Sequence, residues 1–214
     1  MDFAVFIGEE KTLIFQKKQG IVLNEPSLLA LKNEKVVAVG KTAVQLIDDP
    51  DIVFKQVVRR NYIVNIDYAS VFMNIILKKV GTMCKCIICI PSSLDQEALN
   101  DYKSVVYTAG VADAVFVPSV IANAYATDYD INSQDEFLSI VIDGEYVDMA
   151  VIRGGEIIGG GTLYSMQKFE QAKKQLISTH KITKQFTGDR ISVVNGAGAL
   201  LSKQEVVKKI IELN

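Results

Sequence analysis

The most informative stretch of the sequence is Gly20-Ile21-Val22-Leu23-Asn24-Glu25-Pro26-Ser27-Leu28-Leu29-Ala30-Leu31. A second apolar run, Val-Val-Ala-Val, follows at residues 36–39. Polar residues at 24–27 and 32–35 interrupt the apolar runs at lengths typical of single strands. We therefore predict strands near 20–24 and 36–39, with short polar connections.

Outward from this stretch, the chain alternates strands and helices. Upstream, apolar runs at 2–7 and 12–16 flank Gly8 and predict a hairpin. Downstream, caps and apolar periods predict helices at 42–47, 67–80, 93–109, 119–126 and 165–179, strands at 86–90, 114–117, 138–142, 147–153, 156–158 and 191–194, and a last helix after a turn at 195–198. The glycines at 159–161 are expected to break the chain. This order predicts an α/β protein with mixed sheets flanked by helices.

Composition excludes several classes of protein. The 214 residues carry 25 acidic and 23 basic side chains, a net charge of −2, so no basic surface for nucleic acid is expected. Apolar residues make up 49% of the chain, which excludes intrinsic disorder. No apolar run approaches the roughly 20 residues of a membrane span, and no secretory signal is recognised at the start. We expect a cytoplasmic globular protein of one large domain or two small ones.

Three cysteines are spaced as C-x-C-x-x-C at Cys84, Cys86 and Cys89. Side chains alternate faces along a strand, so Cys86 and Cys89 are expected on opposite faces of the 86–90 strand. A zinc site wants four ligands, and the single histidine, His180, is far away in the sequence. We predict buried thiols, no metal site, and a solvated or capping role for His180.

Two hairpins in the sequence resemble each other. Residues 6–9 lead into the strand at 12–15, and residues 142–145 lead into the strand at 148–152. In each, an apolar strand turns at Gly-Glu and returns as a second apolar strand. This internal echo is consistent with a duplicated fold.

The block at 20–31, followed by Val-Val-Ala-Val-Gly-Lys at 36–41, closely resembles bacterial actin homologues of the MreB type. Shorter matches keep the order of that family at 89–93, 108–111 and 195–201. The resemblance implies the actin-like (ribonuclease H-like) duplicated fold, with two mixed-sheet domains and flanking helices. It also implies a cleft that binds ATP, and filaments that organise cell-wall synthesis and rod shape.

The resemblance also implies a division of the chain. Residues 1–112 match the first actin-like domain, with a small outer subdomain near 20–62, and 113–214 match the second. The second match is trimmed: the outer part of that domain and its last strand-and-helix segment have no counterpart here. We therefore expect a truncated member of the family.

The residues that handle nucleotide in the family match poorly. Its first phosphate hairpin carries Asp-Leu-Gly-Thr, where this chain has Phe6-Ile7-Gly8-Glu9. A carboxylate at this position would repel phosphate oxygens by a few kcal/mol at an effective dielectric constant of about 20. The glutamate pair that precedes a proline in the family aligns with Phe116-Val117 before Pro118. The resemblance therefore implies that the carboxylates positioning the attacking water are absent.

The second phosphate hairpin and the late glycine turn are degenerate as well. Asp143 and Gly144 stand where the family has Asp-Ile-Gly-Gly-Gly-Thr, so one glycine remains. Only the turn at 195–198 keeps a nucleotide-facing form. If ATP and Mg²⁺ bind at all, the resemblance implies that they contact Gly8, Thr12, Asp143, Gly144, Gly196 and Gly198. We predict no catalytic residue, no metal site and no resident cofactor.

These features favour a degenerate MreB-like protein that has lost ATP hydrolysis and acts by binding proteins. Its partners would be other copies of itself or a full-length actin-like filament protein, in cell shape or division. The alternative is a divergent but active ATP-binding filament protein, and a third possibility is a function on some unrelated surface. ATP binding with phosphate release separates the first two.

Membrane attachment in this family uses an amphipathic N-terminal helix or an apolar loop. No such helix is predicted before Asp2, and the corresponding loop shortens to Gly81–Lys85 with Met83 as its only large apolar residue. We expect no direct insertion into a membrane, with any recruitment to the membrane periphery occurring through partners.

Overall fold

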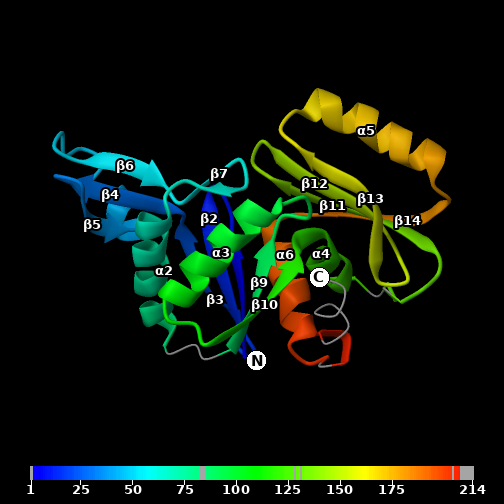
Figure 1. The fold of residues 1–214 in the computed structure, drawn as a ribbon, viewed down its shortest axis with the longest axis horizontal. Coiled ribbons are helices and arrows are strands. Elements are labelled where there is room, and N and C mark those ends of the chain that lie inside the picture. Colours follow the sequence, from blue (N-terminus) through cyan, green and yellow to red (C-terminus); the bar gives the residue numbers. More distant parts are fainter. Residues whose placement is uncertain (1, 82–84, 128, 131, 204, 208–214) are drawn as a thin grey trace.

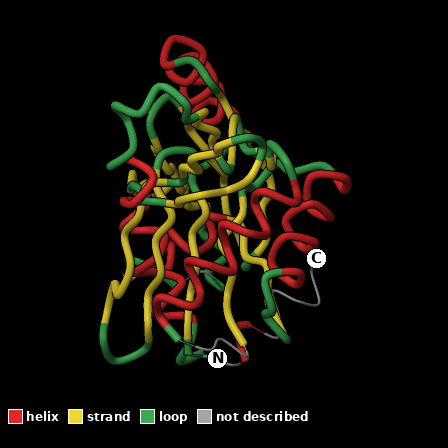
Figure 2. The backbone as a smooth tube through the Cα atoms, turned by 90° about the vertical axis from the view of Figure 1, so that its left-hand side faces the viewer, coloured by secondary structure: helices red, strands yellow, loops and turns green. Residues whose placement is uncertain are grey.

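The computed structural model describes residues 2–207 except 82–84, 128, 131 and 204. Five layers succeed one another in it (Figure 1): helices, a sheet, helices, a second sheet and a last helix. Helices lie on both sides of the first sheet (Figure 2). Mixed sheets with flanking helices confirm the predicted α/β class. Cys84 and Met83, both named above, lie outside the described residues.

The first sheet has the order β10-β9-β1-β2-β3. Its strands are β10 (Asp113–Pro118), β9 (Lys85–Ile90), β1 (Phe3–Ile7), β2 (Lys11–Gln16) and β3 (Gly20–Pro26). The hairpin β1–β2 is antiparallel, as predicted, and β9 and β10 add in parallel. Since β10 extends this sheet, the boundary predicted after residue 112 falls before the last strand of the first half.

Helices α2 (Ile66–Val80) and α3 (Gln96–Thr108) cover the outer face of the first sheet. Their apolar faces, including Phe72, Met73 and Tyr102, join Val5 and Ile88 in one buried cluster. Asn65 caps α2 by accepting from Tyr68 N–H at 2.9 Å, and Asp95 caps α3 by accepting from Ala98 N–H at 2.8 Å. Both helices were predicted, with caps displaced by two residues.

A small outer part follows β3. It contains the three-stranded sheet β5-β4-β6, the short helix α1 and the two-stranded β7–β8, in the segments β4 (Leu28–Lys32), β5 (Lys35–Val39), α1 (Lys41–Val44), β6 (Val53–Gln56), β7 (Val58–Arg59) and β8 (Tyr62–Ile63). The predicted outer subdomain near 20–62 thus begins only after β3, whose seven residues pair with β2 in the first sheet.

The second sheet has the order β13-β12-β11-β14. Its strands are β11 (Glu136–Asp143), β12 (Tyr146–Arg153), β13 (Glu156–Leu163) and β14 (Ile182–Gly188). Only α5 (Met166–Thr179) lies between β13 and β14, and it covers the outer face of this sheet (Figure 1). His180 ends α5, with Nδ1 3.4 Å from Glu136 Oε2.

Helices α4 (Ser119–Tyr125) and α6 (Arg190–Leu200) fill the space between the two sheets. A buried cluster lies there and joins residues of both sheets, such as Phe6 and Ala150, to residues of both helices, such as Val120 and Val194. Cys89 belongs to this cluster, whereas Cys86 belongs to the cluster on the opposite face of the first sheet. The predicted alternation of these buried thiols is confirmed.

The two sheets repeat one topology. In each, a central strand (β1 or β11) pairs antiparallel with the next strand of its hairpin, which pairs antiparallel with a third. On its other side the central strand pairs in parallel with a strand that follows a helix, β9 or β14. The internal echo in the sequence therefore reflects two halves with the same strand order.

The segment 182–200 corrects the predicted course of the chain. A strand was expected at 191–194, with a turn at 195–198, but the strand is β14 and residues 191–198 lie within α6. Asp189 begins the helix by accepting from the N–H groups of Ile191 and Ser192 at 2.9 and 3.0 Å. The β-branched residues Ile191, Val193 and Val194 favour a strand locally, but burial of the two valines between the sheets stabilises the segment as a helix.

The glycines at 159–161 were predicted to break the chain, and this prediction is wrong: they lie inside β13. The strand pairs with β12 through an irregular register between Val151 and Ile152. Gly160 has φ of +134°, and a Cβ there would lie 2.1 Å from the Met149 carbonyl oxygen. Glycine is thus required by the close approach of two strands, which the sequence alone does not reveal.

Candidate functional site at the interdomain cleft

The turns of the two echoing hairpins meet between the halves of the molecule. The first hairpin closes through Gly8 N–H donating to Lys11 carbonyl oxygen at 3.0 Å. A Cβ on Gly8 would lie 2.6 Å from Asp143 Oδ2, so the first turn touches the second directly. Gly8, Asp143 and Gly144, three of the residues predicted for a site, are therefore brought together.

Arg190 of α6 connects both turns. Its Nη2 lies 2.6 Å from Glu10 Oε2, and its Nε lies 3.1 Å from Asp143 Oδ1. The Asp143 side chain is 1% exposed and that of Arg190 is 20% exposed. The guanidinium group is held at this point because Asp189 fixes the start of α6. The chain thus supplies its own counter-charge where the two turns converge.

Burial raises the pKa of Asp143 to about 6. Arg190 lowers this pKa, while Glu10, Glu9 and Asp189 raise it by repulsion. The rise shows that one arginine does not offset burial and three neighbouring carboxylates. A further anion at this point would meet the same repulsion.

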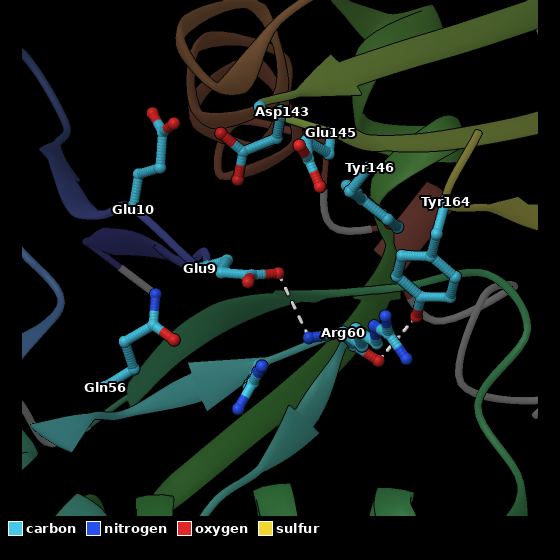
Figure 3. Close-up of a pocket in the computed structure, with 10 residues that line it drawn as sticks. Glu9, Glu10, Gln56, Arg60, Asp143, Glu145, Tyr146 and Tyr164 are labelled. Carbon is cyan, nitrogen blue, oxygen red and sulfur yellow. Dashed lines mark hydrogen bonds between the residues drawn. The ribbon is translucent and has the colours of Figure 1, made fainter. Parts of the chain in front are cut away.

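A pocket of about 250 Å³ opens beside this contact (Figure 3). Four carboxylates and two guanidinium groups contribute to its lining, together with Gln56, Gly144 and two tyrosines; the charged residues are Glu9, Glu10, Asp143, Glu145, Arg59 and Arg60. Acidic groups therefore outnumber basic ones in the pocket, and they come from both hairpin turns.

The turn between β7 and β8 bridges the pocket. Glu9 Oε2 accepts from Arg60 N–H at 3.0 Å, and the Tyr164 hydroxyl donates to the Arg60 carbonyl oxygen. The Arg60 guanidinium carbon lies 5.9 Å from the centre of the Tyr164 ring. The outer part of the first half is thereby tied to β1–β2 and to the end of β13 (Figure 3).

A second buried carboxylate, Asp148 on β12, also joins the two halves. Its Oδ2 accepts from Ser92 N–H at 2.9 Å, and its Oδ1 accepts from the Ser92 hydroxyl. Thr162 also donates to Oδ1, at 3.4 Å, and Asp148 is fully buried. Burial raises the pKa of Asp148, while the hydrogen bonds from Ser92 oppose that rise.

Three residues predicted to contact nucleotide lie elsewhere. Thr12 is fully buried in the first half, where its hydroxyl is 2.9 Å from that of Ser27. Gly196 lies inside α6, and a Cβ there would be 1.8 Å from the Ala122 carbonyl oxygen. Gly198 packs against the Phe15 ring in the same way. Both glycines lie inside α6 and not in the predicted turn, and there they let the helix approach its neighbours, while their contact with nucleotide stays a prediction.

Two residues at the cleft, Arg190 and Asp148, escaped the sequence analysis. The strand predicted at 191–194 concealed Arg190, since the register of α6 decides where its side chain lies. A signal did exist: Gly188-Asp189-Arg190 contains an acidic N-cap residue, typical of a strand-to-helix turn. Asp148 stands alone in an otherwise apolar strand, a pattern that often marks a partnered buried carboxylate.

In the described residues, no group of His, Cys, Asp and Glu has an arrangement that could hold a metal ion. Nor does the described part contain any helix with the length and apolar character needed to cross a membrane.

Comparison with known proteins identifies the family. A model described as MreB/Mbl protein matches residues 1–166. The chain belongs to the MreB/Mbl family. It is 23% identical to the cell shape-determining protein MreB of Haemophilus influenzae over 186 residues, covering 80% of this chain and 53% of that protein. It is 25% identical to the cell shape-determining protein Mbl of Bacillus subtilis over 171 residues, covering 76% and 51%.

Solved structures of MreB proteins share the fold. MreB5 of Spiroplasma citri bound to ADP superposes with a TM-score of 0.68 at 22% identity, covering 82% of this chain and 56% of that one. The same protein bound to AMPPNP gives a TM-score of 0.67 at 21% identity, with the same coverage. The chain spans about half the length of the curated MreB and Mbl relatives it matches.

Proposed function

We propose that this MreB/Mbl family member is a non-hydrolysing, actin-like protein that acts through protein association in the cytoplasm, in the organisation of cell shape. The observation that carries the proposal is the contact of Arg190 with Asp143 and Glu10. The resemblance to MreB-type proteins implies that the two hairpin turns bind the phosphate groups of a nucleotide. Here the turns present carboxylates to each other, and a guanidinium group of the chain lies between them.

The charged groups that line the cleft do not suit a nucleoside triphosphate. Two unit charges of the same sign 4 Å apart repel by about 4 kcal/mol at an effective dielectric constant of 20. Glu9, Glu10, Asp143 and Glu145 line the pocket. The cationic group nearest the turns, Arg190, is already ion-paired. A phosphate chain would have to displace these ion pairs and then face the released carboxylates.

The proposed mode of action rests on contacts that the chain itself makes across the cleft, without a ligand. Contacts across it come from Arg190, from Asp148 with Ser92, and from Tyr164 with Arg60. A subunit closed in this way would present one fixed surface to a filament partner. We propose that this partner is a full-length MreB-type protein or another copy of the chain, since the H. influenzae and B. subtilis relatives are named as cell shape-determining proteins.

Isothermal titration with Mg²⁺ and ATP tests the first half of the proposal. We expect no heat of binding at micromolar ATP and no phosphate release. Micromolar binding with phosphate release would overturn the proposal in favour of the divergent ATPase.

Co-sedimentation with filaments of the full-length MreB protein of the same organism tests the second half. We expect the chain to pellet with those filaments, or to change their amount, in the same way with and without ATP. A chain that neither pellets with the filaments nor changes them would contradict the filament-partner role.

A further inference from the structure

Asn123 places a fully buried amide group on α4. All seven residues of this helix are buried, and the helix lies between the two sheets (Figure 1). A buried amide costs stability unless its donors and acceptor find partners. Its Nδ2 donates to the Ser139 hydroxyl oxygen at 3.0 Å and to the Ile140 carbonyl oxygen at 3.1 Å, both on β11. Since a carbonyl can only accept, the nitrogen of the amide is the atom that faces β11.

The amide oxygen of Asn123 binds the first turn of α6. It accepts a hydrogen bond from the Ser192 hydroxyl at 2.6 Å. The same hydroxyl lies 2.7 Å from the carbonyl oxygen of Asp189, which is the N-cap residue of α6. A hydroxyl group has a single proton, so this proton is shared between α4 and the N-cap. Ser192 thus joins the buried amide to the start of α6.

The end of β14 lies directly on this hydrogen bond. A Cβ on Gly188 would lie 1.9 Å from Ser192 Oγ and 2.1 Å from Asn123 Oδ1, so a side chain does not fit there. Gly188 is the last residue of the strand and immediately precedes the N-cap. The end of the strand, the cap and the first helical turn therefore all pack around one amide group.

We propose that Asn123 is a positioning residue for the cleft: through Ser192 it fixes the place from which Arg190 reaches both hairpin turns. This inference rests on the role of Arg190 in the proposed function. It does not depend on whether the cleft binds nucleotide.

The geometry of α6 relates Ser192 to Arg190. Ser192 and Gly196 are four residues apart, so both lie on the side of the helix that packs against α4. Each residue turns a helix by about 100°, so Arg190, two residues before Ser192, points about 200° away from the Ser192 direction. The close approach at Gly196 sets the distance between the helices, and the hydrogen bond of Ser192 sets the rotation of α6. A rotated helix would move the guanidinium group within the cleft.

Orientation is what a buried network of this kind supplies. Exchanging both partners of a buried hydrogen bond for apolar groups of the same shape can be nearly neutral for stability. A satisfied network nevertheless allows few arrangements, because each donor must meet an acceptor. Arg190 needs a defined orientation, since its Nη2 contacts Glu10 of the first hairpin and its Nε contacts Asp143 of the second.

The pKa of Asp143 reports the position of Arg190. Arg190 lowers this pKa, whereas Glu10, Glu9 and Asp189 raise it. Asp189 moves together with Arg190 but has the smallest of these effects. Displacing the guanidinium group should therefore raise the pKa of Asp143 above its value of about 6.

NMR titration of the Asp143 carboxyl carbon in the 214-residue chain tests the proposal. Arg190→Gln defines the full effect, which we expect to be a rise of about 1 in the pKa. Ser192→Ala removes the hydroxyl that bonds to Asn123 and should raise the pKa by about half as much. Ser139→Ala is the matched control, because it removes a hydrogen bond on the β11 side of the same amide. It should leave the pKa unchanged.

Urea denaturation of the two serine variants separates positioning from stability. Both should be destabilised by similar amounts, since each loses a hydrogen bond to the same buried amide. A pKa rise confined to Ser192→Ala then reports the position of α6. No rise in Arg190→Gln, no rise in Ser192→Ala, or an equal rise in Ser139→Ala would refute the proposal. Calorimetry with Mg²⁺ and ATP is a separate test: ATP binding by the parent chain would overturn the proposed function and leave these pKa results standing.

Discussion

Arg190 Nε lies 3.1 Å from Asp143 Oδ1, and this ion pair joins the first turn of α6 to the second hairpin of the molecule. The same guanidinium group reaches Glu10 of the first hairpin. Three segments that are far apart in the sequence therefore share one charge centre. The first two predictions follow from this centre.

Replacing Arg190 by glutamine should lower the free energy of unfolding by about 2 kcal/mol. Breaking a fully buried ion pair costs about 3–5 kcal/mol, and Arg190 retains some exposure. Urea denaturation at pH 7 measures the loss. Lys85→Gln, which removes an exposed ion pair with Asp113, is the control and should cost less than about 1 kcal/mol. Equal losses for the two variants would show that the cleft ion pair stabilises the fold no more than an exposed ion pair does.

The raised pKa of Asp143 makes the free energy of unfolding depend on pH, and the sign of this dependence is fixed. Its folded value of about 6 exceeds the unfolded value of about 3.9, so the folded state binds this proton more tightly. The resulting stability is fully present below about pH 4 and is lost as the pH rises through about 6. Asp148, whose pKa burial also raises, acts in the same direction.

Denaturation of the parent chain and of Asp143→Asn, compared between pH 4.5 and 7.5, measures this contribution. The difference in unfolding free energy between parent and variant should shift by about 2 kcal/mol in favour of the parent towards low pH. A difference that does not vary over this range would mean that Asp143 titrates as an ordinary exposed carboxyl.

Asp148→Ala should destabilise the chain by about 2–3 kcal/mol. The substitution leaves the half-buried Ser92 N–H, and the Ser92 hydroxyl, without their acceptor across the cleft. Ser93→Ala is a matched control, because Ser93 also contacts the other half, through Thr162, but at an exposed position. We expect a loss below about 0.5 kcal/mol for Ser93→Ala in the same urea titration. Similar losses for the two variants would contradict a stabilising role for the hydrogen bonds of Asp148.

Gly196→Ala distinguishes two roles of this glycine by the sign of its effect. At an open helical position, alanine stabilises by about 1 kcal/mol relative to glycine. Against the Ala122 carbonyl oxygen, the added Cβ forces α6 away from α4 and should cost about 1–3 kcal/mol. Asn195→Ala, exposed on the same helix, should be neutral or stabilising. A stabilised Gly196→Ala protein would disprove the packing role.

Most helices and strands of the first half could be predicted from the sequence, because each has an apolar period and a turn or cap that a short window contains. The hairpin around Gly8, helix α2 and the strand of Cys86 and Cys89 each carry a clear period and a turn or cap. β14 was missed because its exposed Thr183, Lys184 and Gln185 lack the apolar alternation of a half-buried strand. The helical state of residues 191–194 depends on packing between two sheets, which no local window contains.

The residues of the candidate site also fall into those that the sequence could indicate and those that depend on tertiary packing. Gly8, Asp143 and Gly144 were named because the resemblance to MreB-type proteins implies a role for the two hairpin turns, and those turns can be recognised locally in the sequence. Arg190 was missed because its position follows from the start of α6 at Asp189, and the strand predicted at 191–194 concealed that N-cap. Gly196 and Gly198 were predicted in a turn and lie in a helix, because a glycine required for close packing looks the same in a sequence as a glycine required in a turn.

The position of Arg190 within the chain has a consequence for how the protein responds to its surroundings. A cleft that closes around a dissolved ligand follows the concentration of that ligand, whereas a tethered guanidinium group has a fixed effective concentration. Dilution cannot remove it, and metabolite levels do not set its occupancy. The proton, which competes with Arg190 for Asp143, is the small solute best placed to loosen this contact. This contact would thus respond to acidity and not to the concentration of a dissolved ligand.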